Sequence, residues 1–105
     1  MSSSQDNSGT ANSPRAQGGT ALEVRVCNAR GLHARAAAKL VRMADTFDAV
    51  VVVAKDDAEV TATSILGLMM LGASMGSILR VSARGAEADR ALHAIASLIQ
   101  RGFDE

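Results

Sequence analysis

The chain has 105 residues, with eleven Lys and Arg against eleven Asp and Glu, so its formal net charge is zero. This length suits one domain of ordinary size. The chain contains two aromatic residues, Phe47 and Phe103. It therefore lacks the basic face and the aromatic platforms that are typical of nucleic-acid binding, and we expect no nucleic-acid partner.

The signals for location are few. The single cysteine, Cys27, has no partner for a disulfide within the chain, which is typical of a reducing compartment. No stretch approaches the roughly 18 consecutive apolar residues of a membrane span. The first twenty residues lack the charged and apolar regions of a secretory signal. We therefore expect a cytoplasmic domain that does not insert into a membrane.

The chain divides into a polar tail and one domain. Residues 1–20 are mostly Ser, Asn, Gly, Gln, Thr and Ala, with the only proline, Pro14, and no Val, Leu or Ile. Such a segment buries too little surface to offset the entropy of ordering it, roughly 1–2 kcal/mol per residue. The sequence predicts a disordered tail over 1–20 and a folded domain over 21–105.

Strand and helix patterns alternate along the domain. Leu22, Val24 and Val26 alternate with other residues as in a half-buried strand, and an apolar stripe at helical spacing follows Gly31. Further strands are predicted at 49–54, 58–62 and 77–83, and helices at 64–71 and 87–101. This order favours an antiparallel sheet with helices on one face. The predicted core residues are Leu40, Val51, Val81, Leu92 and Ile95.

His33 is the residue best placed for chemistry. It directly precedes the first helical stripe, so its ring is expected where a helix begins, and Arg35 follows two residues later. A helix start has N–H groups without internal partners and a positive potential. A phosphate on the ring of His33 could therefore accept N–H bonds and a guanidinium contact. The alternative is a histidine that merely ends a loop, and His93 is predicted to be an ordinary surface residue on the last helix.

The short predicted helix carries a second signal, because it is apolar on every side. Such a helix is either buried all round or displays a patch, and a domain of about 85 residues can hardly enclose it. We expect part of its surface, including a methionine, to be exposed as a docking site. The alternative is a fully covered core helix. Ser64 stands at its predicted N-cap.

Other catalytic arrangements have little support. One cysteine and two histidines at these spacings match no metal site, and no glycine-rich phosphate loop occurs. A nucleophilic pair of Cys27 with His33, or of Ser64 with His33, stays open, although no orienting partner is recognisable. We expect no metal, no cofactor and no self-contained enzyme.

Two segments resemble a known family. The run GLHARAA over 31–37 resembles the active-site segment of HPr, the phosphocarrier of the bacterial phosphotransferase system. The run SILGLMMLG over 64–72 resembles that family's second signature, around its regulatory serine. The resemblance extends from about Leu22 to Glu105. It implies an α+β fold, an open-faced β-sandwich with a four-stranded antiparallel sheet in the order 1-4-2-3 and three helices on one face.

The resemblance also implies roles for single residues. His33 would take a phosphoryl group on Nδ1 from phosphorylated Enzyme I and pass it to a IIA-type protein, with Arg35 as the cation beside the phosphate. Ser64 matches the serine that HPr kinase phosphorylates in lineages that have one. A dianion there would bring charge to an apolar docking surface and weaken contact with Enzyme I. The residues at the family's docking positions are Ala34, Ala38, Ile65, Leu66 and Met69.

The sequence departs from the family pattern at one position, and its motifs resemble two different branches of the family. The family commonly has proline where this chain has Ala36, so we expect a less rigid first helical turn with function retained. The motif around Ser64 resembles kinase-regulated HPr, whereas 47–49 and 101–105 resemble the nitrogen-related branch, so the choice between a sugar-transport and a nitrogen-related branch stays open. We expect a monomeric phosphocarrier in a regulatory phosphotransferase system. The alternative is a regulatory adaptor that binds partners through 64–71 without phosphoryl relay. Asp104 and Glu105 are expected to be dispensable for folding.

Overall fold

The computed structural model describes residues 20–105. The predicted tail therefore lies outside the described residues except for Thr20, which already belongs to the first strand. The elements in chain order are β1 (Thr20–Arg25), α1 (Ala34–Asp45), β2 (Val50–Lys55), β3 (Ala58–Thr61), α2 (Ile65–Met69), β4 (Ile78–Arg84), α3 (Ala88–Gln100) and a 3-10 turn, η3 (Gly102–Asp104). Every predicted strand and helix is present, with ends that differ by one or two residues.

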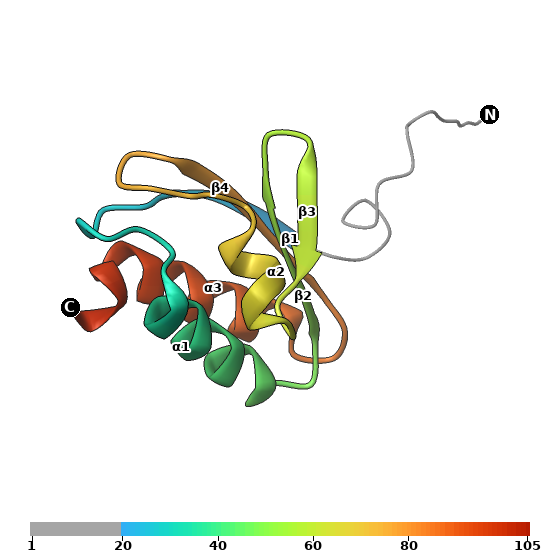
Figure 1. Ribbon diagram of the computed structural model, residues 1–105. Coiled ribbons are helices and arrows are strands. Elements are labelled where there is room, and N and C mark those ends of the chain that lie inside the picture. Colours follow the sequence, from blue (N-terminus) through green and yellow to red (C-terminus); the bar gives the residue numbers. More distant parts are fainter. Residues whose placement is uncertain (1–19) are drawn as a thin grey trace.

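The four strands form one antiparallel sheet in the order β1-β4-β2-β3, and the helices lie together on one side of it (Figure 1). The fold class that the resemblance implied is confirmed. Val81 in the central strand β4 stands opposite Leu22 of β1 on one side and Val53 of β2 on the other. This register places the apolar residues of three strands in one row across the sheet.

The core lies between the sheet and the helices. α3 contacts β1, β4 and β2, and α1 contacts both α3 and α2. The five predicted core residues are confirmed, since none is more than 3% exposed. Leu22 does not follow its strand pattern, because it is 40% exposed while Val24 is buried. β1 is an edge strand, so Leu22 has a neighbouring strand on one side only.

The loop before α1 is held against the loop after α2. The Leu32 N–H donates to the Ala73 carbonyl at 3.0 Å, and Gly31 takes a left-handed φ of +66°. A Cβ at Gly31 would lie 2.5 Å from the Ala73 oxygen, so only glycine permits this approach. The contact sets the start of α1 beside the end of α2, although Leu32 and Ala73 are 41 positions apart in the chain. Within residues 20–105 no helix is both long and apolar enough to cross a membrane.

Candidate functional site

His33 is the N-cap residue of α1, as predicted. Its backbone is extended, with φ −82° and ψ 179°, and its carbonyl accepts the first helical hydrogen bond, from the Ala37 N–H, at 2.8 Å. The ring Nδ1 accepts a hydrogen bond from the Arg35 N–H at 3.3 Å. The side chain remains 15% exposed. Nδ1 therefore faces the free N–H groups of the helix start, where an anion would be stabilised.

The other ring nitrogen of His33 is bound by the end of the chain. Nε2 contacts the side-chain carboxylate of Glu105, although the two residues are 72 positions apart. A carboxylate only accepts hydrogen bonds, so Nε2 carries the proton. In the neutral ring this leaves the lone pair on Nδ1. The Glu105 contact thus selects the tautomer in which Nδ1 is unprotonated.

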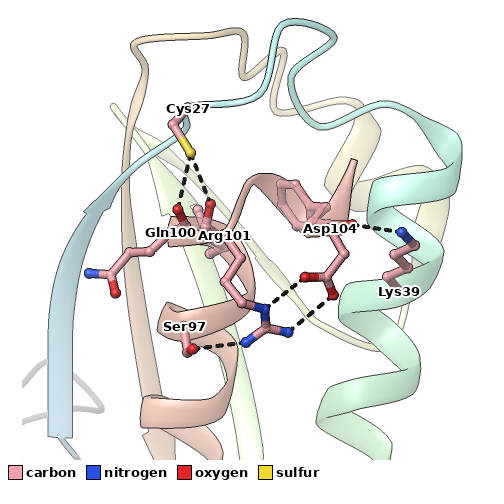
Figure 2. Close-up of polar contacts among 8 residues, drawn as sticks. Cys27, Lys39, Ser97, Gln100, Arg101 and Asp104 are labelled. Carbon is pink, nitrogen blue, oxygen red and sulfur yellow. Dashed lines mark hydrogen bonds and ion pairs between the residues drawn. The ribbon is translucent and has the colours of Figure 1, made fainter.

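A turn after α3 brings Glu105 to this position. Gly102, Phe103 and Asp104 all have left-handed φ angles, between 58° and 68°, and the chain end lies beside the start of α1 (Figure 1). Phe103 is fully buried, and Lys39 of α1 donates to its carbonyl at 2.6 Å. Figure 2 shows Arg101 bonded to the Asp104 carboxylate, at 2.8 and 3.2 Å. A buried ring and two cationic side chains hold the turn, which outweighs the cost of left-handed backbone at two residues that are not glycine.

Sequence analysis missed these C-terminal contributors. From the sequence, Glu105 was expected only to be dispensable for folding, and no role was predicted for Lys39. Gly102, placed just after the last helix, is a common signal for a helix end and a reversal. That signal could have indicated a turn. Nothing in the sequence indicates which side chain the turn would deliver to His33.

The Glu105 carboxylate predicts a pH dependence of stability. Its pKa lies below the ordinary value because Asn28 and, second, His33 donate hydrogen bonds to it, while burial acts in the opposite direction. A pKa that is lower in the folded than in the unfolded state contributes stability above the unfolded pKa, and this is lost as the pH falls through the folded one. Glu105→Gln is therefore expected to be less stable than the wild type at pH 7, with a difference that begins to shrink below about pH 4.3 and disappears only below the lowered pKa of the folded state.

Denaturant unfolding of both proteins at pH 7 and pH 3 measures this difference. Glu59→Gln, which changes an exposed carboxylate on β3, is the control and should follow the wild type at both pH values. A Glu105→Gln deficit of equal size at both pH values would contradict the expectation.

Arg35 supplies an uncommitted positive charge at the start of α1. Its side chain is exposed and takes part in no ion pair within residues 20–105. The guanidinium is therefore available to an anion held at Nδ1 of His33. Ala36, where the family commonly has proline, is fully buried on the inner side of α1, and α1 still begins at Ala34.

The helix α2 displays apolar side chains, as expected. It has five residues, preceded by Ser64 as N-cap, whose Oγ accepts the Gly67 N–H at 2.9 Å. Of the residues in α2 only Leu68 is buried, so the alternative of a fully covered helix is wrong. The α2 patch consists of Ile65, Leu66, Met69 and Met70, which are 39–78% exposed. On the adjoining helix α1, Ala34 is exposed and Ala38 is half-buried.

The two nucleophilic pairs left open by the sequence are not formed among the described residues. The Cys27 thiol donates to the carbonyls of Ile99 and Gln100, at 3.5 and 3.3 Å, and Figure 2 shows it turned to the end of α3. The Ser64 hydroxyl serves as the cap of α2. His93 is exposed on α3, as predicted, with Nδ1 2.8 Å from the Asp89 carbonyl. No group of three potential metal ligands is found in the described part of the chain.

The site therefore defines a class of protein: a domain in which an oriented imidazole lies at a helix start that can stabilise an anion, next to an exposed apolar patch. Comparison with known families agrees. The model of the family described as "PTS HPr component phosphorylation site" matches residues 21–101. The chain belongs to this HPr family of phosphocarrier proteins.

Individual relatives cover the same region. The phosphocarrier protein NPr of Shewanella violacea is 43% identical over 83 residues, which are 79% of this chain and 91% of that protein. The phosphocarrier protein HPr of Pseudomonas aeruginosa is 42% identical over 86 residues, 81% of this chain and 96% of that protein. The crystal structure of HPr-C-His from Thermoanaerobacter tengcongensis aligns with a TM-score of 0.78 and 38% identity, over 82% of this chain and 97% of that one.

Proposed function

We propose that His33 accepts a phosphoryl group on Nδ1 from phosphorylated Enzyme I and passes it to a IIA-type protein, in the cytoplasm and as a monomer. The observation that carries the proposal is the contact between Nε2 of His33 and Glu105. It leaves the Nδ1 lone pair as the nucleophile at the start of α1. Membership of the phosphocarrier family supports the same assignment.

The transfer follows from these contacts. The Nδ1 lone pair attacks phosphorus while the bond between phosphorus and the donor atom of Enzyme I breaks, and that electron pair stays with the donor. The Nε2 proton remains in place, so the His33 ring becomes cationic, and the Glu105 carboxylate stabilises that charge. The phosphoryl oxygens can be bound by the Arg35 guanidinium and by N–H groups of the first turn of α1. In the second step a nucleophile of the IIA-type protein attacks the phosphorus, and the bond to Nδ1 of His33 breaks. His33 is thereby regenerated and the phosphoryl group has only been passed on, so we propose a carrier and not an enzyme.

The docking residues support a relay between proteins. We propose that Ala34, Ala38, Ile65, Leu66 and Met69 contact Enzyme I and the IIA-type protein in turn. The α2 patch lies next to the helix that begins at His33, and large exposed apolar side chains in one place are typical of a protein–protein contact. An adaptor role through the same patch, without relay, is the second candidate, and the exposure of Met70 and Leu66 favours it equally.

We further propose that phosphorylation of Ser64, by an HPr kinase where one is present, regulates the carrier. The Ser64 side chain is exposed at the edge of the α2 patch. A phosphate there would add about two negative charges to an apolar contact surface. Relatives named NPr and HPr both match this chain, and together with the Ser64 motif this supports a regulatory phosphotransferase system.

The test of the carrier is the intact mass of the protein after incubation with phosphoenolpyruvate and Enzyme I, before and after brief acid treatment. One added phosphate that acid removes is expected, since a phosphohistidine is acid-labile whereas a phosphoserine is not. An Enzyme I that phosphorylates another HPr must be used, and the cognate Enzyme I as well. No phosphate gain with either would overturn the carrier and leave the adaptor as the better proposal.

A further inference from the structure

We propose that Asn28 is a positioning residue for phosphorylation at His33, because its side-chain amide holds the Glu105 carboxylate and the turn before His33 at the same time. The proposal rests on the proposed function of His33. It assigns Asn28 no contact with the phosphate; Asn28 acts through Glu105.

The contacts of Asn28 reach both segments that meet at His33. Its Nδ2 donates to the Gly31 carbonyl at 2.8 Å and to Oε1 of Glu105 at 3.0 Å. Its own carbonyl accepts the Gly31 N–H at 3.1 Å, which closes the turn over 28–31. Asn28 also packs against Gly102, where a Cβ would lie 3.5 Å from the Asn28 Cβ. A single side chain thus fixes the distance between the loop before α1 and the C-terminal turn.

The two oxygens of the Glu105 carboxylate contact two different side chains, Asn28 and His33. Oε1 accepts from Asn28, while Oε2 faces Nε2 of His33. A carboxylate held at one oxygen cannot rotate away from the imidazole without losing a hydrogen bond to a charged group, and such bonds are stronger than neutral ones. The lowered pKa of Glu105, for which the Asn28 bond is the largest cause, agrees with this geometry.

The orientation of the Asn28 amide also favours a functional role. Asn28 is 7% exposed, and its Oδ1 is buried with no hydrogen-bond partner in the described part of the chain. Turning the amide over would set Oδ1 against two other acceptors, the Gly31 carbonyl and the Glu105 carboxylate. The two acceptors therefore fix the orientation of the amide, so that Nδ2 and not Oδ1 faces Glu105.

The test compares Asn28→Ala and Asn28→Asp with the wild-type chain. Asn28→Asp keeps the size of the side chain but replaces the donor by an acceptor that repels Glu105. Three quantities are measured: the share of the Nε2–H tautomer of His33 from ring nitrogen NMR, the pKa of Glu105 from its carboxyl carbon shift, and kcat/KM for phosphorylation by Enzyme I. We expect a smaller Nε2–H share, a Glu105 pKa closer to the ordinary value, and a fall in kcat/KM of about tenfold, as for one lost hydrogen bond to a charged group.

Two controls separate positioning from a general loss of structure. Gln100→Ala changes an exposed side chain that lines the same surface cavity as Asn28, and it should match the wild type in all three measurements. In a Glu105→Ala background, Asn28→Ala should cause no further loss of the Nε2–H tautomer. If Asn28→Ala does not fold, as judged by its amide NMR spectrum, Asn28→Asp and Asn28→Ser decide.

The outcomes are distinct for the two proposals. A folded Asn28→Asp protein with the wild-type tautomer share and the wild-type kcat/KM overturns the role of Asn28. A shifted tautomer without any change in kcat/KM overturns it as well, since positioning would then have no effect on transfer. If Enzyme I phosphorylates neither the wild type nor the variants, the proposed function fails, and an unchanged tautomer in the folded variants would still refute the contact through Glu105.

Discussion

His33→Ala is expected to gain no phosphate from Enzyme I and phosphoenolpyruvate, under conditions in which the wild type gains one. The substitution removes the only imidazole at the start of α1, and no other described side chain combines a nucleophilic nitrogen with that helix start. His33 is partly exposed at the N-cap, so its loss removes chemistry more than packing. Intact mass spectrometry of the two proteins, run side by side, measures the difference.

His93→Ala is the matched control for this prediction. His93 is the second histidine of the chain and lies exposed on α3, outside the site. The His93→Ala protein should gain phosphate at the wild-type rate. An acid-labile phosphate on the His33→Ala protein would show that another residue accepts the phosphoryl group. A loss of phosphorylation in a folded His93→Ala protein would show the same.

Ser64→Asp is expected to lower kcat/KM for phosphorylation by Enzyme I by about 10- to 100-fold, equivalent to about 1.4–2.8 kcal/mol. The new carboxylate would stand at the N-cap of α2, beside Ile65 and Leu66, which are 41% and 66% exposed. Contact with a partner would then have to remove water from a charge without an opposite charge to compensate. The fold should be unaffected, because aspartate is as good an N-cap as serine and suits the positive end of a helix.

Ser64→Asn is the control, since asparagine has the shape of aspartate and caps a helix equally well but carries no charge. It should remain close to the wild type. Steady-state kinetics with varied concentrations of the carrier measure kcat and KM separately. The effect of Ser64→Asp should be mainly an increase in KM, as expected for weakened docking. Equal losses in both variants would indicate that the hydroxyl itself, and not the absence of charge, matters.

Local sequence patterns predicted most of the fold. The alternation around Val24, the helical stripe through Leu40 and the inward side of the last helix through Leu92 were all confirmed by burial. These patterns are informative because a half-buried strand repeats every two residues and an amphipathic helix every 3.6. Even the exposure of α2 followed from a local argument, since a helix apolar on all sides cannot be enclosed by so small a domain.

Leu22 shows where a local pattern stops being informative. Its alternation is that of an inward-facing residue, yet it is 40% exposed. Periodicity tells which side of a strand a residue occupies, but exposure also depends on whether the strand lies at the edge or in the middle of the sheet. That choice is made by pairing between distant strands, here β1 with β4.

The parts of the candidate site that lie close together in the chain could be predicted from the sequence. His33 and Arg35 are neighbours in the chain, and the helix start that gathers them is a local feature with local signals. Ser64 and the α2 patch likewise lie within one short segment. Residues of this kind can be predicted because a cap, a turn and a helix place them within a few positions of one another.

The rest of the candidate site depends on contacts between distant parts of the chain. Glu105, Asn28 and Lys39 act on the site through contacts with residues 64 to 77 positions away. These contacts require the left-handed turn over 102–104, the buried ring of Phe103 and the packing of α1 against α3. The spacing of apolar residues along the sequence cannot predict such contacts, because side chains far apart in the chain meet only when whole helices and strands pack together. Sequence patterns therefore predicted the strands, the helices and the histidine at the start of α1, whereas the packing of α3 and its C-terminal turn set which ring nitrogen of that histidine is unprotonated.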